Sequence, residues 1–419
     1  QMYFDPNAGE FGQPSAQNPW FNQVATHPYS IGYDFNHESQ ATKYFVKKVL
    51  KYWLQEFKID GFRFDLSKGL TQTNTGGNIS AWSAYDQSRI NIILDYAASI
   101  RQTDPSAFII LEHLGVVSEE SVYADNGLML WGKATDQYNE ATMGWLNGQN
   151  QNLYNTTPQS RGWGNYGLLS YMESHDEERL MYKNIEYGNS NGTYNTRSLP
   201  TALDRMAEAA AFFITLPGPK MIWQFGELGY DYSITDCLDG TFSADCRTGT
   251  KPLHWEYYDN IDRRDLFDVY RKLIYLKRTQ PQMRDLGLFM DLGQYEKVVR
   301  FTNSDFNCVI AGNFDVVGQE MNPAFQFSRM WYDYLTGDSL DVSNPGNAFS
   351  YQPGEFHVYN DRKIIPPANP YGEEPNVVLP LDNTNNIQVY PNPFNNELVF
   401  NLNEKSSSAN IRICDITGR

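Results

Sequence analysis

The sequence predicts an α/β protein built on a (β/α)8 barrel and followed by smaller β domains. Three observations predict this fold. Amphipathic helices are followed at once by short apolar runs, and this unit recurs along residues 42–278. Several of the apolar runs end at a charged or polar side chain. Such endings fit a barrel, because barrel active sites lie at the carboxyl ends of the strands.

The expected elements follow one another in a regular order. Residues 1–39 are rich in Pro, Asn, Gly and aromatic side chains without a helical period, which predicts a long loop region. In residues 42–57 apolar side chains recur at helical spacing, with lysines on the other face, which indicates an amphipathic helix. The predicted helices cover residues 42–57, 85–100, 202–214 and 264–278, and the predicted strands cover 59–65, 108–111, 168–172 and 220–224.

The pattern changes after residue 280, and this change gives the expected domain organisation. Residues 1–280 are predicted to form the barrel part. Residues 281–360 alternate short apolar runs with Asn, Gly and Asp, which predicts a small antiparallel β domain. Residues 361–386 have the proline content of a linker, and a further β unit is expected over residues 387–419.

Composition and charge exclude several classes of partner. The net charge is −17, with 50 acidic against 33 basic residues, so no basic surface is expected that would bind nucleic acid. No apolar run approaches the roughly 18 residues that a transmembrane helix needs. Aromatic residues make up 15% of the chain, which suits stacking on sugar rings as well as core packing.

Two of the four cysteines lie close together in the sequence. Cys237 and Cys246 flank a Gly- and Asp-containing stretch, and no second cysteine cluster lies near them. A loop disulfide fits this spacing better than a zinc site does. Cys308, between Asn307 and two apolar residues, is expected to be a buried strand thiol.

Two carboxyl groups are placed where a barrel would bring them together. Asp65 and Glu112 each end an apolar strand. Retaining hydrolysis of a glycosidic bond needs two carboxyl groups about 5 Å apart, one as nucleophile and one as general acid. Arg63 lies two residues before Asp65, so its side chain leaves the same face of the strand and would keep Asp65 ionised. The four apolar residues before Glu112 favour a raised pKa, as a general acid requires.

Each of these features also has a purely structural interpretation. An isolated Arg-x-Asp is more often a structural ion pair, and the pair His175-Asp176 at a strand end would serve equally as a helix cap. The joint occurrence of three such groups at the ends of successive strands favours a catalytic site.

Three segments resemble signature regions of the alpha-amylase family of glycoside hydrolases. They are Asp60-Gly-Phe-Arg-Phe-Asp-Leu-Ser-Lys68, Ile110-Leu-Glu-His113 and Glu173-Ser-His-Asp176, in the order that the family shows. The resemblance covers about residues 1–359. It implies that Asp65 is the nucleophile, Glu112 the acid/base and Asp176 the transition-state stabiliser. It further implies that Arg63 and His175 contact the cleaved sugar and that Lys68 contacts the acceptor side.

The sequence departs from the family pattern in two places. The family's first signature region and the first barrel strands are absent, and a barrel of so few strands cannot close. We therefore expect a fragment of a longer protein, which by itself is inactive or needs the missing segment to fold. The second departure is Gly69, where many amylases carry His, which puts acceptor-side specificity in doubt.

The motifs do not select a single activity within the family. Ser174-His-Asp-Glu177 resembles branching enzymes, whereas Asp60-Gly-Phe-Arg-Phe-Asp-Leu66 resembles debranching enzymes, and both act on α-1,6 links. Hydrolysis of α-1,4-glucans such as starch, glycogen and maltooligosaccharides is the first interpretation. Transglycosylation uses the same carboxylates, and a non-catalytic glucan-binding barrel is the alternative from another class.

The resemblance also bears on cofactors and on location. No cofactor is required for the chemistry, but many relatives hold a structural calcium, and Asp34 and Asn36 offer hard oxygen ligands. Residues 387–419 resemble the opening of a type IX secretion sorting domain, a β-sandwich-like module that is truncated here. This implies a secreted or cell-surface enzyme whose C-terminal domain contacts the secretion machinery. A disulfide would persist in that compartment.

Overall fold

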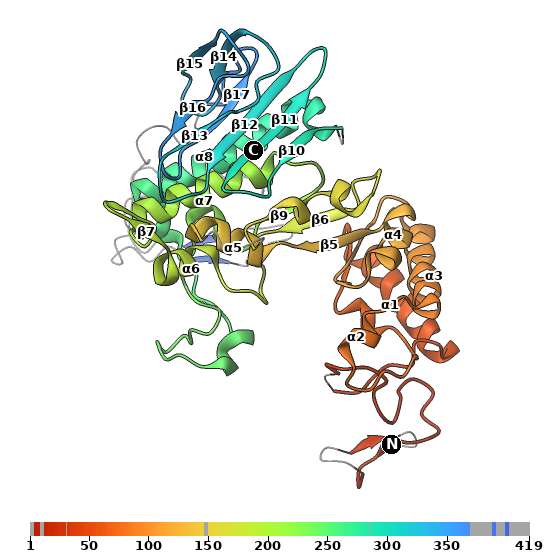
Figure 1. Ribbon diagram of the computed structural model, residues 1–419. Helices are drawn as coiled ribbons and strands as arrows, with labels where there is room; N and C mark the ends of the chain where they lie inside the picture. The colour runs from red at the N-terminus through yellow and green to blue at the C-terminus, as the bar shows by residue number, and fades with distance from the viewer. Residues whose placement is uncertain are drawn as a thin grey trace. The chain divides into compact units, whose positions relative to one another are not determined.

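The computed structural model describes residues 4–8, 12–30, 32–145, 150–285 and 287–368, together with the short segments 388–390 and 399–401. The chain divides into two compact units, Gln1–Pro367 and Ala368–Arg419. The division falls inside the predicted linker over residues 361–386. The first unit contains a parallel sheet with its helices and an antiparallel sheet (Figure 1).

The parallel sheet carries the candidate site. Its order is β3-β4-β5-β6-β9, and every neighbouring pair runs parallel, so all the carboxyl ends lie on one edge. Phe64 pairs with Leu111, which means that Asp65 and Glu112 leave adjacent strands at the same level. The strands are β3 (Gly61–Phe64), β4 (Phe108–Leu111), β5 (Met129–Lys133), β6 (Leu168–Tyr171) and β9 (Lys220–Met221).

Helices alternate with these strands, as the sequence predicts for a barrel. They are α1 (Gln40–Glu56), α2 (Ile79–Trp82), α3 (Gln87–Thr103), α4 (Val117–Asp125), α5 (Thr135–Met143), α6 (Leu180–Tyr187), α7 (Leu199–Ile214) and α8 (Ile261–Thr279). The side chain of Asp86 caps α3 by accepting from the amides of Ser88 and Arg89. α1 packs against α3, and α7 packs against α8. The described part of the sheet therefore has the βα architecture of half a barrel.

The antiparallel sheet that the sequence predicts after residue 280 is present. Its order is β10-β11-β12-β17-β14-β15, and β13 pairs with β16 beside it. Cys308 is fully buried in β12, as expected. The strands are β10 (Phe289–Asp291), β11 (Glu296–Thr302), β12 (Asn307–Asn313), β13 (Gln319–Met321), β14 (Arg329–Asp333), β15 (Ser339–Val342), β16 (Phe349–Tyr351) and β17 (Phe356–Asn360).

One hydrophobic core joins the helices α7 and α8 to the antiparallel sheet. Phe212 of α7, Leu273 of α8 and Ile310 of β12 are all fully buried members of the same cluster. Gly312 allows the close approach, because a Cβ there would lie 2.8 Å from the ring of Phe212. This shared core explains why both parts belong to one compact unit.

The structure differs from the expected elements in two strands of the parallel sheet. β5 was not predicted, because Met129–Lys133 is short and only partly apolar. The last predicted strand, 220–224, is reduced to Lys220–Met221. The chain turns away soon afterwards, where Phe225 adopts a left-handed conformation at φ 54°. Short pairs also occur: β1 (Phe4–Asp5) with β2 (Gln13–Pro14), and β7 (Ser190–Asn191) with β8 (Tyr194–Asn195).

The expected sorting domain lies largely outside the described residues. Within it, β18 (Gln388–Tyr390) pairs antiparallel with β19 (Val399–Asn401). The sorting-domain assignment therefore stays a prediction from the sequence.

Candidate active site

Arg63 joins the two carboxylates that end β3 and β4. Its Nη1 lies 2.6 Å from Oδ1 of Asp65, and its Nη2 lies 2.6 Å from Oε2 of Glu112. The Asp65 side chain is 75% exposed, whereas the Glu112 side chain is only 10% exposed. The sequence placed Arg63 beside Asp65, and the structure adds that the same guanidinium also holds Glu112. One accessible carboxylate and one buried carboxyl thus stand side by side.

The environment of Glu112 raises the pKa of its carboxyl group. Burial is the main cause, and the neighbouring Asp65 adds to it, while the amide of Leu66 and the guanidinium of Arg63 act in the opposite direction. The Leu66 amide donates to Oε2 of Glu112 at 3.1 Å. Leu66 adopts a left-handed conformation at φ 41°, in which its amide points at this carboxylate. A raised pKa is the property that a general acid needs.

His175 and Asp176 follow β6 and come to the same rim. Nε2 of His175 lies 3.4 Å from Oδ2 of Asp176, and both side chains are 43% exposed. The ring of His175 contacts the rings of Trp131 and Trp223, with centroids 6.1 and 5.7 Å apart. The guanidinium of Arg63 lies over the same Trp131 ring, 4.3 Å from its centroid. Trp131 therefore connects the two halves of the candidate site.

Tyr171 lies near carboxylates from two strand ends. Tyr171, at the end of β6, is buried edge-to-face against Trp131, with ring centroids 5.0 Å apart. Burial raises the pKa of its hydroxyl, and the charges of Glu177, Glu112 and Asp176 raise it further. Carboxylates from two separate strand ends thus act on one phenol.

Trp131, Tyr171 and Trp223 were not identified as site residues from the sequence. Trp131 lies in β5, the strand that was not predicted. Tyr171 and Trp223 lie in apolar runs that were interpreted only as strands. An aromatic side chain at or near a predicted strand end is the signal that would have found Tyr171 and Trp223, because that end faces the active site of a barrel.

Lys68 is buried and makes its hydrogen bonds with Ser83 and Leu114. It is 7% exposed, and its Nζ donates to Oγ of Ser83 at 2.9 Å and to the carbonyl oxygen of Leu114 at 3.1 Å. The ammonium also lies over the ring of Trp82, 4.4 Å from its centroid. In this arrangement Lys68 ties the segment after β3 to the segment after β4. A contact with an acceptor sugar stays a prediction.

The space beside Gly69 is taken by a histidine from the early loop region. A Cβ at Gly69 would lie 3.1 Å from two atoms of the His27 imidazole. His27 is stacked on Trp82, with ring centroids 5.5 Å apart. The position at which many amylases carry His therefore has a histidine next to it that comes from a distant part of the sequence.

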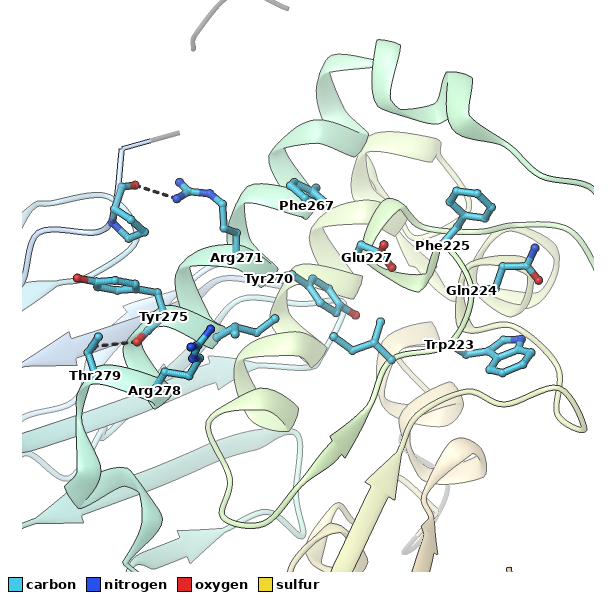
Figure 2. A pocket seen from close by; sticks show the side chains of 13 residues that line it. Trp223, Gln224, Phe225, Glu227, Phe267, Tyr270, Arg271, Tyr275, Arg278 and Thr279 are labelled. Atoms are coloured by element: carbon cyan, nitrogen blue, oxygen red, sulfur yellow. Dashed lines mark hydrogen bonds between the residues drawn. The ribbon is translucent and has the colours of Figure 1, made fainter. Parts of the chain in front are cut away.

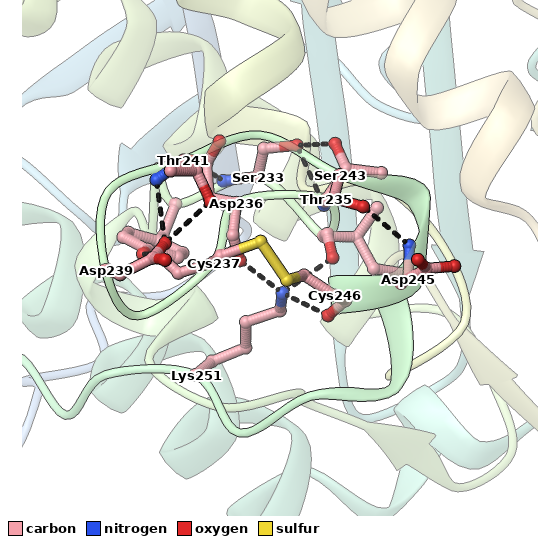
Figure 3. The surroundings of a disulfide bond; sticks show 12 residues. Ser233, Thr235, Asp236, Cys237, Asp239, Thr241, Ser243, Asp245, Cys246 and Lys251 are labelled. Carbon is pink, nitrogen blue, oxygen red and sulfur yellow. Dashed lines mark hydrogen bonds between the residues drawn. A yellow bond between two sulfur atoms is a disulfide. The ribbon is translucent and has the colours of Figure 1, made fainter.

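A disulfide closes the loop that follows β9. Cys237 and Cys246 are bonded, with their Cα atoms 5.3 Å apart (Figure 3). The Nζ of Lys251 donates to the carbonyl oxygen of Cys246 at 2.9 Å and to that of Asp236 at 2.8 Å. Arg247, next to the disulfide, donates through Nη2 to the carbonyl oxygen of Asp176. The disulfide loop, residues 237–246, is thereby connected to the candidate site.

The two expected calcium ligands accept hydrogen bonds from the protein. The Oδ2 atom of Asp34 accepts from the side-chain amide of Asn22 at 2.7 Å, and its Oδ1 lies 3.3 Å from Nε2 of His27. The Oδ1 atom of Asn36 accepts from the amides of Glu38 and Ser39. Within the described ranges no group of three or more His, Cys, Asp or Glu side chains is arranged to hold a metal ion. A structural calcium stays a prediction, and no step below depends on it.

A cavity of about 800 Å³ lies between the turn after β9 and helix α8. Figure 2 shows Trp223 and Phe225 at one end of its lining and Tyr275 and Thr279 at the other. Neither Asp65, Glu112 nor Asp176 lines it. The cavity is therefore separate from the paired carboxylates, although Trp223 both lines the cavity and contacts His175.

Comparison with known proteins gives a likeness in structure alone. No family model matches the sequence, and no curated protein matches it. Among solved structures, the alpha-amylase of Geobacillus thermoleovorans in complex with acarbose is similar over 79% of this chain, at 15% identity and a TM-score of 0.57. The fold is that of the alpha-amylases. The matched part spans 66% of that enzyme's chain.

Two further solved structures are similar to this chain in fold. A cyclomaltodextrinase matches 86% of this chain and 55% of its own, at 15% identity and a TM-score of 0.58. AmyP in complex with maltose matches 88% of this chain and 74% of its own, at 14% identity and a TM-score of 0.56. These likenesses confirm the predicted barrel-type fold.

Proposed function

We propose that this protein is a retaining glycoside hydrolase of the alpha-amylase type that acts on α-glucans through a covalent glycosyl-enzyme intermediate. One observation carries the proposal. The guanidinium of Arg63 holds both Asp65 and Glu112 at 2.6 Å, so an exposed carboxyl group and a buried carboxyl group of raised pKa meet at adjacent strand ends. The solved structures of similar fold include enzymes in complex with acarbose and with maltose. This supports an α-glucan as substrate.

The two carboxyl groups take different roles because their surroundings differ. Asp65 is the more exposed, and its carboxylate is held by the guanidinium of Arg63 at the rim where a nucleophile must stand. Its carboxylate attacks the anomeric carbon while Glu112 donates its proton to the leaving oxygen. Glu112 then removes a proton from the attacking water, which cleaves the glycosyl-enzyme bond and releases the sugar. The carboxyl carbons are expected to lie about 5 to 5.5 Å apart, as in retaining enzymes.

His175 and Asp176 are assigned to the sugar at the cleaved bond. Both are partly exposed on the rim, beside Trp131 and Trp223. The carboxylate of Asp176 stabilises the positive charge that develops on the sugar ring in the transition state. The imidazole of His175 donates to a sugar hydroxyl, and the aromatic rings limit access of water to the reacting carbon.

The test is the product pattern on three polysaccharides. The protein is incubated with amylose, amylopectin and pullulan, and the products are sized and their anomeric configuration is followed by NMR. Short α-configured products from amylose support α-1,4 hydrolysis with retention, whereas cleavage of pullulan alone at its α-1,6 links indicates a debranching enzyme. Initial products of inverted configuration would contradict the retaining mechanism. Glucan binding without any products would indicate a non-catalytic barrel.

We also propose that the enzyme acts outside the cytoplasm. The disulfide between Cys237 and Cys246 supports this location, because such bonds persist in oxidising compartments. The resemblance of residues 387–419 to a sorting domain supports export through type IX secretion. No helix in the described ranges is long and apolar enough to cross a membrane. Fractionation of cells that express the natural protein tests the location.

A further inference from the structure

A buried charged network lies directly behind Glu112. Glu119 of α4 and Arg89 of α3 form an ion pair at 2.6 Å, with side chains 0% and 1% exposed. His113, the residue after Glu112, lies 3.0 Å from Glu119 and is also fully buried. The Oγ atom of Ser67 lies 3.0 Å from Nδ1 of His113. We call these four residues, Ser67, Arg89, His113 and Glu119, the buried network.

The network is fully satisfied around its arginine. The guanidinium of Arg89 donates twice to Glu119, at 2.7 and 2.6 Å. Its remaining donors reach the carbonyl oxygens of residues 68, 82 and 84. All five N–H groups of an arginine are thus used. Burial alone would raise the pKa of Glu119, but its contacts with His113 and Arg89 lower it to about 2. Glu119 is therefore ionised at every physiological pH.

His113 lies between Glu119 and Ser67 in the buried network. Burial lowers the pKa of His113 more than Glu119 raises it. Its Nε2 lies 3.0 Å from Oε1 of Glu119, and its Nδ1 lies 3.0 Å from Oγ of Ser67. The hydroxyl of Ser67 also donates to the carbonyl oxygen of Glu112 at 3.1 Å. The side chain of Ser67 therefore contacts both His113 and the main chain of Glu112.

Ser67 connects the network to the main chain of Glu112. The amide of Ser67 donates to the carbonyl oxygen of Glu112 at 2.9 Å. The preceding amide, that of Leu66, donates to the Glu112 carboxylate at 3.1 Å. In the other direction, the amide of Glu112 donates to the carbonyl oxygen of Phe64 at 3.0 Å. The segment just after Asp65 is therefore fastened to the segment that carries Glu112.

We infer that the buried network positions Glu112 against Asp65, with Ser67 and His113 as positioning residues for the acid/base step. The inference rests on the proposed function. The network touches no reacting atom. It holds the main chain on both sides of the Glu112 side chain and keeps the Leu66 amide in place against the carboxylate. Misplacement of a catalytic group by about 1 Å costs on the order of a hundredfold in rate, so such a device has a measurable effect.

The test compares His113→Gln and Ser67→Ala with a buried ion pair elsewhere. Glu208→Gln is the matched control, because Arg205 and Glu208 also form a fully buried pair, at 3.0 Å, within α7 on its side toward Gly312 of the antiparallel sheet. Activity is measured on a natural glucan and on an aryl maltooligoside whose leaving group needs no proton. Melting temperature is measured for all variants.

We expect His113→Gln to lower kcat on the natural glucan by about 10- to 100-fold with KM little changed. The loss on the aryl substrate should be much smaller, because that leaving group does not depend on Glu112. Ser67→Ala should show the same split to a lesser degree. Glu208→Gln should lower the melting temperature without any preference between the substrates. Equal losses on both substrates for His113→Gln and Glu208→Gln would overturn the inference.

A second readout does not depend on turnover. The pKa of Glu112 is followed by ¹³C NMR of labelled carboxyl groups in the wild type and in His113→Gln. The groups that face Glu112 are Arg63, Asp65 and the Leu66 amide, and its charge also acts on Lys68 and Tyr171. Because the network keeps the Leu66 amide against the carboxylate, and this amide lowers the pKa of Glu112, loosening the network should raise that pKa. An unchanged pKa of Glu112 in His113→Gln would contradict positioning by the network. An inactive wild type would contradict only the proposed function, because this pKa can be measured without turnover.

Discussion

The two halves of the candidate site are built in different ways. At the ends of β3 and β4, Glu112 is backed by the buried network and fastened by main-chain hydrogen bonds. After β6, His175 and Asp176 are almost half exposed and are supported by aromatic contacts and by Arg247, which follows the disulfide loop. Proton transfer is thus assigned to a residue backed by a buried network, whereas the sugar contacts are assigned to exposed side chains beside a loop. Substitutions in the first half should therefore lower mainly kcat, whereas substitutions in the second half should mainly raise KM.

The largest effect is expected at Asp65, the exposed carboxylate in the half of the site formed by β3 and β4. Asp65→Asn should lower kcat by roughly 10⁴-fold or more while glucan binding survives, because the covalent step is lost but the sugar contacts remain. Kinetics on amylose and binding by calorimetry measure the two quantities. Asp60→Asn is the matched control, since Asp60 is exposed at the opposite end of the same strand. Turnover near that of the wild type would remove Asp65 from its role.

A smaller and more selective loss is expected at Glu112. Glu112→Gln should lower kcat on natural glucans by about 10²- to 10⁴-fold and much less on activated aryl substrates. The pH profile of kcat/KM tests whether Glu112 acts as the proton donor. As the pH rises through the raised pKa of Glu112, the proton donor is lost, so the alkaline limb of kcat/KM belongs to this group and should vanish in the variant.

Glu296→Gln is the control for Glu112, because Glu296 also has a pKa raised by burial but lies on β11 of the antiparallel sheet. It should leave the profile unchanged. If the alkaline limb persists in Glu112→Gln, another group supplies the proton.

The third-largest loss of activity is expected for Arg63→Lys. A lysine keeps the charge but cannot hold Asp65 and Glu112 at once, nor lie flat on Trp131. We expect kcat to fall by about 10²-fold, because one of the two carboxylates loses its partner. Arg300→Lys serves as the control, since Arg300 lies over the ring of Phe289 in the antiparallel sheet. Equal kinetics of the two variants would show that Arg63 is merely structural.

The sequence predicted side chains that stand at strand ends, but not the contacts between residues far apart in the chain. Asp65, Glu112 and Arg63 were predictable, because each stands at or near the end of an apolar run and the registers of β3 and β4 match. The buried network was not, because Arg89 and Glu119 lie 30 residues apart and only folding brings them together. Trp131 was missed because β5 is too short to show a strand period. The two-residue β9 was overestimated because apolarity continues into a turn.

The smallest effect is expected at the disulfide loop, on the half that contacts the sugar. Reduction, or the double change Cys237→Ser and Cys246→Ser, frees the residue next to Arg247 and with it the contact to Asp176. The loop entropy released is worth about 2 to 3 kcal/mol in the loop-closure model. Because the loop makes no contact with Glu112 in the described part of the chain, we expect KM to rise a few-fold, on the order of 1 kcal/mol, with kcat nearly unchanged. Reducing agent should add nothing further in the double variant, which separates this bond from the buried thiol of Cys308. A fall in kcat without a change in KM would show that the loop supports the chemistry rather than the binding of the glucan.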